Sequence, residues 1–348
     1  MLTFLLKKIF YGILVLIGVV VLVFVLFQGF GDPARLVMGQ TGDAKTQANI
    51  RKELHLDEPK WKQFLRYAND VSPIGIHTAE EIQTKELKGF FIGGTRKIGL
   101  KLPYLRKSYQ SKKPVGTILM EALPGTLLLA VAAMLLAICL GIPLGMAAAV
   151  RQNTWVDTSA VFSSILGISA PSFFMGIIIA YVFGFVLSNV TGLHITGSWF
   201  DIDDQGQKRL TLQNLILPAI TLGIRPLAII TQLTRSALLD VLDQDFIRTA
   251  YAKGLSRRTI LWKHGLRNAL NPVITAVTGW FAELLAGAFF IEYIFGWKGI
   301  GKVTVDALEK LDFPVVMGSV LVSAAFFILV NMLADILYGL VDPRVRIK

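Results

Sequence analysis

Long stretches of this 348-residue chain contain no aspartate, glutamate, lysine or arginine, and no other feature constrains the fold as strongly. They include residues 9–27, 122–150 and 158–200, which are 19, 29 and 43 residues long. A helix needs about 20 mostly apolar residues to cross the hydrocarbon core of a membrane. Helices in soluble cores rarely run so far without a charge. The sequence therefore predicts an all-α protein that crosses a membrane several times.

The composition agrees with this prediction, because 53% of the residues are hydrophobic and only 17% are charged, whereas about a quarter of a soluble domain is charged. The net charge of +11 does not indicate nucleic-acid binding, since no basic domain with interspersed aromatic residues accompanies it. Basic loops of a membrane protein explain the charge better. Cys139 is the single cysteine, so the chain can form no intramolecular disulfide.

The apolar segments predict six membrane-spanning helices. The first follows Lys7 and Lys8 and is longer than the apolar part of most signal peptides, so we expect it to be retained, with the N-terminus in the cytoplasm. The other five are expected near residues 117–150, 159–188, 212–236, 268–294 and 314–340. The expected domains are a first helix (1–30), a long extracytoplasmic segment (31–113), a transmembrane domain (114–341) and a cytoplasmic tail (342–348).

The connecting segments carry most of the charge. Residues 32–116 are expected outside, although they hold 16 basic and 9 acidic residues, because the positive-inside rule is weak for segments longer than about 60 residues. Residues 235–267, with seven basic and three acidic residues, are expected in the cytoplasm, and residues 189–211, with two basic and three acidic, outside. Residues 54–65 predict a short amphipathic helix, and residues 74–105 show no clear period.

The cytoplasmic connection, residues 237–267, predicts two short helices. From Asp245 onward, apolar and small residues recur at helical spacing until Gly254 ends the first helix. Ser256 is a suitable N-cap for the second helix. Such a knob could transmit force from a soluble partner. An amphipathic helix on the membrane surface, with a solvated basic face, is the alternative that these residues leave open.

The knob resembles the EAA loop of permease subunits of binding-protein-dependent ABC importers. In that family the loop docks as a coupling helix into the ATPase subunit. The general motif has Glu, Ile and Pro where this chain has Arg248, His264 and Arg267, and these departures resemble the dipeptide, oligopeptide and nickel branch. The matching positions of the loop are Arg248, Thr249, Ala250, Gly254, His264 and Leu266.

Other segments resemble the same branch in the same order along the chain. Residues 287–301 resemble its external re-entrant loop, although Lys298 stands where proline is usual. The matching positions of that loop are Glu292, Phe295, Gly299 and Gly301. The remaining similar segments are 31–33, 113–126, 168–174, 311–318 and 338–344. Residues near 70–110 resemble an insertion that the common pattern lacks.

The resemblance implies a type I importer permease fold in a bacterial inner membrane, with both termini in the cytoplasm. It also implies several partners: a second permease in a heterodimer, two ABC ATPase subunits and an extracytoplasmic solute-binding protein. The implied cargo is a di- or oligopeptide, with nickel or another small solute as the rival within the branch. The resemblance implies no cofactor, no metal and no nucleic acid.

Two charged residues lie inside the expected spans, where charges are costly and usually functional. Arg225 could attract a peptide carboxylate from the pathway, extend to the membrane surface or pair with a partner subunit. Glu283 could bind a cationic group, pair with Arg225 or hydrogen-bond at a subunit interface. Glu292, in the re-entrant loop, is expected to shape that loop rather than to bind cargo.

The sequence offers no catalytic constellation. It has no Gly-x-x-x-x-Gly-Lys-Ser/Thr phosphate loop, so the energy for transport must come from a separate ATPase. Its four histidines lack the spacing of metal ligands. An ATPase-independent secondary transporter or channel would be favoured by inverted repeats, and a membrane-embedded enzyme by an acid–base or metal set; neither feature is visible.

Overall fold

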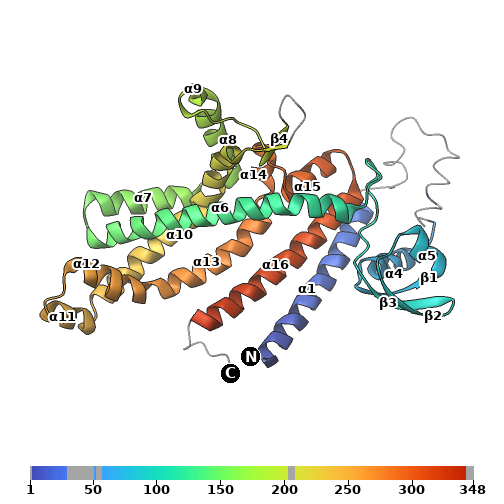
Figure 1. The fold of residues 1–348 in the computed structure, drawn as a ribbon, viewed down its shortest axis with the longest axis horizontal. Coiled ribbons are helices and arrows are strands. Elements are labelled where there is room, and N and C mark those ends of the chain that lie inside the picture. Colours follow the sequence, from blue (N-terminus) through green and yellow to red (C-terminus); the bar gives the residue numbers. More distant parts are fainter. Residues whose placement is uncertain (1, 30–50, 52–56, 203–207, 342–348) are drawn as a thin grey trace. The chain divides into compact units, whose positions relative to one another are not determined.

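The computed structural model describes residues 2–29, 51, 57–202 and 208–341 (Figure 1). The expected motif at residues 31–33, the end of the motif at 338–344 and the tail 342–348 lie outside the described residues. The described chain divides into two compact units. The first unit holds Pro124–Lys302 and the chain from Phe326, and the second holds Leu5–Leu123 and Val303–Ala325.

The chain is mostly helical, as its apolar stretches predict. The helices are α1 (Leu2–Gly29), α4 (Lys60–Val71), α5 (Ala79–Thr84), α6 (Val115–Val150), α7 (Trp155–Ser169), α8 (Ser172–Tyr181), α9 (Ser188–Thr191), α10 (Ile216–Leu242), α11 (Asp245–Ala252), α12 (Arg257–Thr259), α13 (Arg267–Gly287), α14 (Phe289–Ile294), α15 (Ile300–Glu309) and α16 (Phe313–Val341). The strands are β1 (Ile74–Thr78), β2 (Gly89–Gly93), β3 (Arg96–Lys101), β4 (Phe200–Ile202) and β5 (Lys208–Leu210). Val182–Val186 and Ile260–Leu266 are π-helical, and Leu212–Leu215 is a 3₁₀ turn.

Four described segments are long and apolar enough to span a membrane: Leu6–Phe27, Val115–Val150, Leu212–Leu242 and Phe313–Ile336. They confirm four of the expected spans and extend the one at 212–236.

The span expected at 159–188 is instead a broken pair. Trp155–Ser169 and Ser172–Val186 meet at an angle of 108°, and they make a fifth span if the bent pair is counted as one. The physical reason is Pro171, which lacks an N–H and disfavours helical geometry in the residue before it. Ala170 is accordingly extended, with ψ of 133°.

The span expected at 268–294 also requires correction. α13 ends at Gly287, and after Ala288 the separate short helix α14 begins. α13 is not among the described segments that meet the length and hydropathy requirement for a span. By length and apolarity, the described residues therefore supply four of the six expected spans, or five if the bent pair counts as one, and α13 has the sequence position of the sixth.

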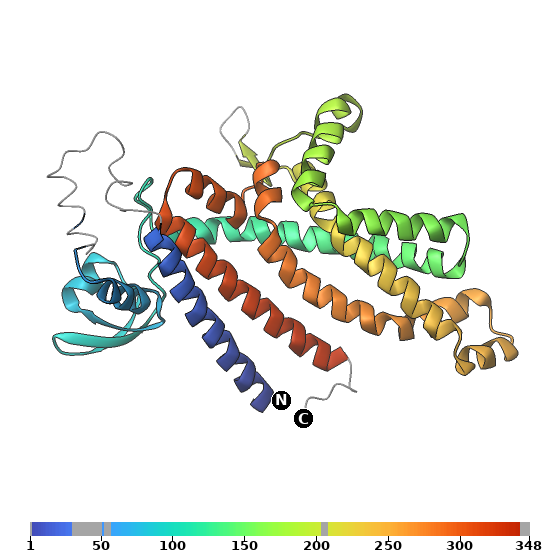
Figure 2. The ribbon, with the colours of Figure 1, turned by 180° about the vertical axis from the view of Figure 1, so that it is seen from behind.

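α10 is the central helix of the first unit. It packs against α13, α7 and α8 (Figures 1 and 2). α6 approaches it closely at Gly145, where a Cβ atom would lie 2.5 Å from the carbonyl oxygen of Thr231. The fully buried Ile230 belongs to the apolar core at this crossing. Small residues on α6 thus allow the two backbones to meet, which is typical of packing between membrane helices.

The second unit combines α1 with a small sheet in the segment expected outside. β1, β3 and β2 form an antiparallel sheet in that order, where the sequence showed no clear period. The helix expected from about residue 54 begins at Lys60, and residues 52–56 lie outside the described part. Phe27 of α1 contacts Phe313 at the start of α16, with ring centroids 5.1 Å apart.

Candidate functional site

The connection expected to form a knob is a helix, a glycine turn and a second helix. α11 ends near Gly254, whose φ is +75°, a conformation that residues with side chains adopt only at a cost. The amides of Gly254 and Leu255 donate to the carbonyls of Tyr251 and Ala250 at 2.9 and 3.3 Å. These two bonds form a Schellman motif. The glycine therefore ends the helix where the sequence predicts.

The second helix begins after Ser256. Its Oγ accepts a hydrogen bond from the amide of Thr259 at 3.3 Å, which confirms the expected N-cap. The α-helical part lasts only one turn, and the chain continues as a π-helix through Ile260–Leu266. The sequence predicts a second helix there but does not indicate its π-helical part. π-turns are rare and occur often at functional sites; His264 lies in this one.

α11 is anchored on one face and open on the other. Ile247 and Ala250 are 1% and 6% exposed, and they pack into an apolar cluster with side chains of α10 and of the π-helix. Arg248 and Thr249 lie on the exposed face. Arg248 pairs with Asp245 at 3.4 Å, and both side chains are highly exposed. The knob thus combines a rigid base with a polar outer surface.

A buried ion pair joins α7 to α10 seven residues before α10 ends. Asp157 is 4% exposed, and both its oxygens accept hydrogen bonds from Arg235, one of them from Nη2 at 2.8 Å. The amide of Asn153 also donates to this carboxylate at 3.0 Å. Such bidentate pairs fix geometry as well as adding energy. Sequence analysis missed the pair because 78 residues separate its members.

An open concavity of about 620 Å³ adjoins the second helix of the knob. Its lining includes Arg151 from the turn between α6 and α7, together with Arg257, Arg258 and Trp262. Three guanidinium groups in one concavity favour an acidic group of a partner. In the sequence, Arg257 and Arg258 stood out only as part of the basic connection 235–267, and Arg151 did not stand out at all.

The two charged residues of the expected spans line one pocket of about 60 Å³ in the first unit. Arg225 comes from α10 and Glu283 from α13, and the wall also includes Ser172, next to the bend between α7 and α8. The guanidinium carbon of Arg225 lies 5.6 Å from the centroid of the Trp280 ring, a cation–π contact. The ion pairs found among the described residues do not join Arg225 to Glu283, and both residues are exposed.

Glu292 lies fully buried behind the expected re-entrant loop. Its carboxylate accepts hydrogen bonds from the amides of Gly301 and Lys302, at 2.7 and 3.2 Å, at the start of α15. Negative charge is favoured at a helix N-terminus, where amides lack partners. A Cβ atom at Gly299 would collide with this carboxylate. These contacts agree with the expectation that Glu292 shapes the loop.

The rest of the loop is equally fixed. Phe295 and Trp297 are 1% and 0% exposed, and the indole nitrogen of Trp297 donates to the carbonyl of Gly125 at 2.9 Å. The amide of Ile300 donates to Thr126 Oγ1 at 2.8 Å. The loop is therefore tied to α6 at Gly125 and Thr126, within the first unit. The described residues contain no group of three or more His, Cys, Asp or Glu that could hold a metal ion.

Two family models cover nearly the whole chain. Residues 141–347 match the "Binding-protein-dependent transport system inner membrane component" model, and residues 1–130 match the model of the N-terminal part of such membrane components. The chain is 35% identical over 349 residues to the glutathione transport system permease protein GsiC of Salmonella paratyphi A. It is also 35% identical over 372 residues to the dipeptide transport system permease protein DppB of Escherichia coli (strain K12). Both alignments cover 100% of each chain.

A solved structure supports the fold. The MetNI methionine ABC transporter, in an inward-facing conformation, has a chain that matches with a TM-score of 0.50 and 16% identity. The match covers 97% of that chain but 65% of this one, so about a third of this chain has no counterpart there. The helical core thus has the type I importer fold, and the relatives are named as transport subunits. The chain belongs to the family of binding-protein-dependent transport system inner membrane components, the permease subunits of ABC importers, within its dipeptide branch.

Proposed function

We propose that this chain forms half of the translocation pathway of an importer of di- or oligopeptides, driven by ATP hydrolysis in separate subunits. Its relatives are named for transport of dipeptides and of glutathione, which is itself a tripeptide. The complete assembly would contain a second, different permease, two ATPase subunits and an extracytoplasmic binding protein that delivers the peptide.

The observation that carries the proposal is the geometry of α11. A helix with buried Ile247 and Ala250 moves as one body with the cluster beneath it. Closure of the ATPase dimer would push the exposed face around Arg248 and Thr249, and the motion would pass into α10 and α13. A transmitting element needs two discrete positions, which a packed helix can supply. The basic concavity at Arg257 and Arg258 adds a second contact for an acidic surface of the ATPase.

The pocket at Arg225 and Glu283 is the proposed contact with cargo. A volume of about 60 Å³ is too small for a whole peptide but holds a charged terminal group. Arg225 suits a terminal carboxylate, because a guanidinium group binds carboxylates with two parallel hydrogen bonds. Glu283 suits a terminal ammonium group. The second permease would supply the opposite wall of the pathway.

The proposed topology places both termini and residues 237–267 in the cytoplasm and residues 31–113 outside. The balance of +4 in residues 235–267 supports this orientation. Glu292, Phe295, Gly299 and Gly301 would hold the re-entrant loop as a fixed frame at the outer end of the pathway. The frame stays in place while the knob moves.

Uptake of a labelled dipeptide into proteoliposomes that contain the complete transporter tests the proposal. Gly254→Ala places a side chain at φ of +75° and strains the end of α11 by about 1 kcal/mol. We expect uptake to fall several-fold while the ATPase still co-purifies. Gly116→Ala is the matched control, because a Cβ atom there meets nothing within 4 Å and the backbone has no positive φ.

Three results would contradict the proposal. The ATPase could fail to co-purify with the unmodified chain, Gly254→Ala could leave uptake unchanged, or the liposomes could accumulate nickel and no peptide. The first two results reject coupling through the knob, and the third rejects peptide as cargo.

A further inference from the structure

One face of the sheet formed by β1, β3 and β2 is covered with exposed apolar side chains. Ile74 pairs with Leu100 and Ile76 with Ile98 across β1 and β3, while Phe90 and Ile92 of β2 lie opposite the same two β3 residues. Residues directly opposite each other point to the same side of a sheet. We call this side the outer sheet face; its residues are Ile74, Ile76, Phe90, Ile92, Ile98 and Leu100, and they are 53–72% exposed.

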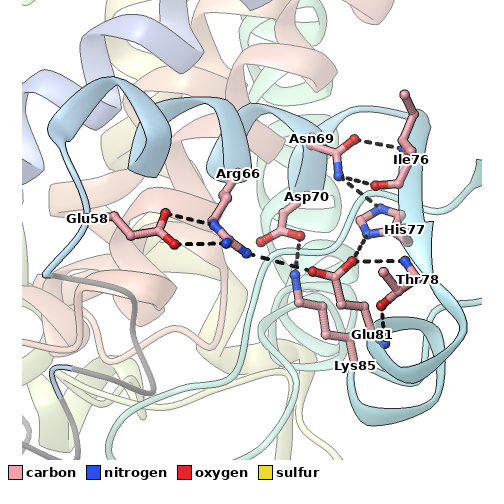
Figure 3. Close-up of polar contacts among 9 residues, drawn as sticks. All are labelled: Glu58, Arg66, Asn69, Asp70, Ile76, His77, Thr78, Glu81 and Lys85. Atoms are coloured by element: carbon pink, nitrogen blue, oxygen red, sulfur yellow. Dashed lines mark hydrogen bonds and ion pairs between the residues drawn. The ribbon is translucent and has the colours of Figure 1, made fainter. Parts of the chain in front are cut away.

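The opposite face of the sheet carries polar side chains, and β1 packs there against α4 and α5 (Figure 3). His77 of β1 and Lys101 of β3 are 1% and 4% exposed. Lys85 donates to Asp70 of α4 at 2.6 Å. The side chain of Asn69 bonds both the amide and the carbonyl of Ile76, each at 2.9 Å (Figure 3).

These bonds fix which face of the sheet points outward. A shift of one residue would exchange the two faces, and it would break the bonds of Asn69 to the backbone of Ile76. The sheet is therefore held with its apolar side outward. Contiguous apolar surfaces of this kind mark contact with another apolar phase or molecule.

The packing of α4 on α1 indicates what the outer sheet face meets. Phe64 and Tyr67 of α4 contact Phe24 of α1, with ring centroids 5.3 and 6.0 Å apart. Phe24 lies near the end of the apolar span Leu6–Phe27. The sheet is thus attached at the level where α1 leaves the membrane. In Figures 1 and 2 the hairpin of β2 and β3 lies on the side of α4 toward the N-terminal end of α1. The apolar span Leu6–Phe27 extends in that direction from Phe24.

The charges on the outer sheet face also suit a lipid surface. Lys88, just before β2, and Arg96, at the start of β3, are exposed and lie two residues before Phe90 and Ile98, on the same face. The three strands contain no acidic residue. Cationic side chains that flank an apolar surface extend toward phosphate groups while the apolar residues enter the acyl region. We propose that the outer sheet face lies in the headgroup–acyl boundary of the outer leaflet and binds phospholipid.

The test uses the complete transporter in lipid nanodiscs, with Cys139→Ser as background. A bimane fluorophore is attached to Ile98→Cys or, on a different strand, to Ile92→Cys. The matched control is Glu80→Cys on the exposed side of α5. We expect phospholipids with a nitroxide on the acyl chain to quench the labels at 98 and 92 several-fold more than the label at 80. Aqueous iodide should show the reverse order.

Equal iodide quenching at all three positions, without quenching by the nitroxide lipid, would overturn the proposal. So would protection at 98 and 92 that appears only after the binding protein is added, because the face would then dock a protein. Because the labels at 98 and 92 lie on different strands, local misfolding caused by one of the substitutions would not by itself produce the same result at both. The measurement needs no transport activity, so its outcome does not depend on the cargo.

Discussion

The knob, residues 237–267, and the sheet module, residues 60–101, distribute polar and apolar residues in opposite ways. In the knob, Ile247 is 1% exposed, while the side chains of Arg248 and Asp245 are 77% and 95% exposed. In the sheet module, His77 is 1% exposed and Phe90 is 72% exposed. The knob buries its apolar side chains and exposes its charged ones, as is usual for a surface in water. The sheet module does the reverse.

This difference teaches that the two regions depend on different forces. The knob is held by an apolar cluster, so its polar surface remains free to bind a partner. The sheet module is held by polar contacts between α4, α5 and β1, and its apolar residues contribute stability only when something apolar covers them. Substitutions of polar residues should therefore affect the two regions differently.

The largest loss of folding stability is expected when the ion pair next to the knob is broken. Asp157→Ala leaves the guanidinium of Arg235 without its main partner in a largely buried place, and removal of one member of a buried pair costs about 3–5 kcal/mol. Because the side chain of Arg235 is 23% exposed, we expect the lower end, about 3 kcal/mol. Denaturant unfolding of the purified chain in detergent measures the loss.

Asp240→Ala is the control for this prediction, since Asp240 is exposed on the same helix and its loss should cost less than about 0.5 kcal/mol. Equal effects of the two substitutions would show that the Asp157–Arg235 pair does not hold α7 to α10.

A smaller loss is expected in the sheet module. Asp70→Ala removes the acceptor of Lys85 at 2.6 Å and the negative charge near the buried Lys101. We expect the sheet module to lose about 2 kcal/mol, because the charged donor Lys85, which is 26% exposed, is left without its bond. Protection of β1 and β3 amides from hydrogen exchange in the intact chain reports this loss.

Glu86→Ala provides the comparison, because Glu86 and Lys107 form an exposed pair at 3.5 Å of the kind that contributes little. If Asp70→Ala were as mild as Glu86→Ala, the polar contacts would not be what holds the sheet module.

Much of this architecture follows from short-range features of the sequence. The charge-free stretches predict the long helices, and Gly254 and Ser256 predict the two ends inside the knob, because these residues act through their own backbone or the next turn. The sequence also contained a usable signal for the sheet: alternating apolar residues such as Ile74 and Ile76. Interspersed glycine and lysine, which are typical of loops, concealed it.

Other features depend on contacts that no local pattern reveals. Asp157 and Arg235 are 78 residues apart, and Arg225 and Glu283 share a pocket only because α10 packs on α13. Pro171 itself predicts an interruption of the helix. The angle of the bend cannot be predicted from it, because proline either kinks a membrane helix or ends it, depending on how the neighbouring helices satisfy the backbone hydrogen bonds.

The histidine of the sheet module should make its stability depend on pH. Burial lowers the pKa of His77, and the positive charges of Lys101 and Lys85 lower it further, while Asp70 and Glu81 oppose the shift. The folded state therefore favours the neutral ring. As the pH falls below about 6.5, His77 binds a proton more readily in the unfolded chain than in the folded one. The folded state therefore loses stability as the pH falls from about 6.5 toward the lower pKa that His77 has in the folded state.

Hydrogen exchange of β1 amides between about pH 7.5 and 5.5, corrected for the intrinsic exchange rate, should show this loss. The His77→Gln variant should show a flatter profile. A knob segment without a buried histidine, such as α11, is the internal control. The same pH profile in β1 of the His77→Gln variant would exclude His77 as the cause.

The smallest expected difference compares two helix caps of unequal construction. At Thr78, hydrogen bonds run in both directions, because Thr78 Oγ1 accepts from the Glu81 amide at 3.2 Å and the Thr78 amide donates to the Glu81 carboxylate at 3.1 Å. Ser256 makes one such bond to the backbone, from the amide of Thr259. Loss of an N-cap side chain costs about 1 kcal/mol. The reciprocal bond also orients Glu81 toward His77, at 3.6 Å. Thr78→Ala therefore disturbs the polar face of the sheet, whereas Ser256→Ala leaves the apolar base of the knob intact.

We expect Thr78→Ala to reduce local protection from hydrogen exchange more than Ser256→Ala does. Ser256→Thr, which keeps the hydroxyl, should change this protection little. Equal losses would mean that the cap of α5 acts alone and that the polar contacts beneath the sheet are less connected than their geometry indicates.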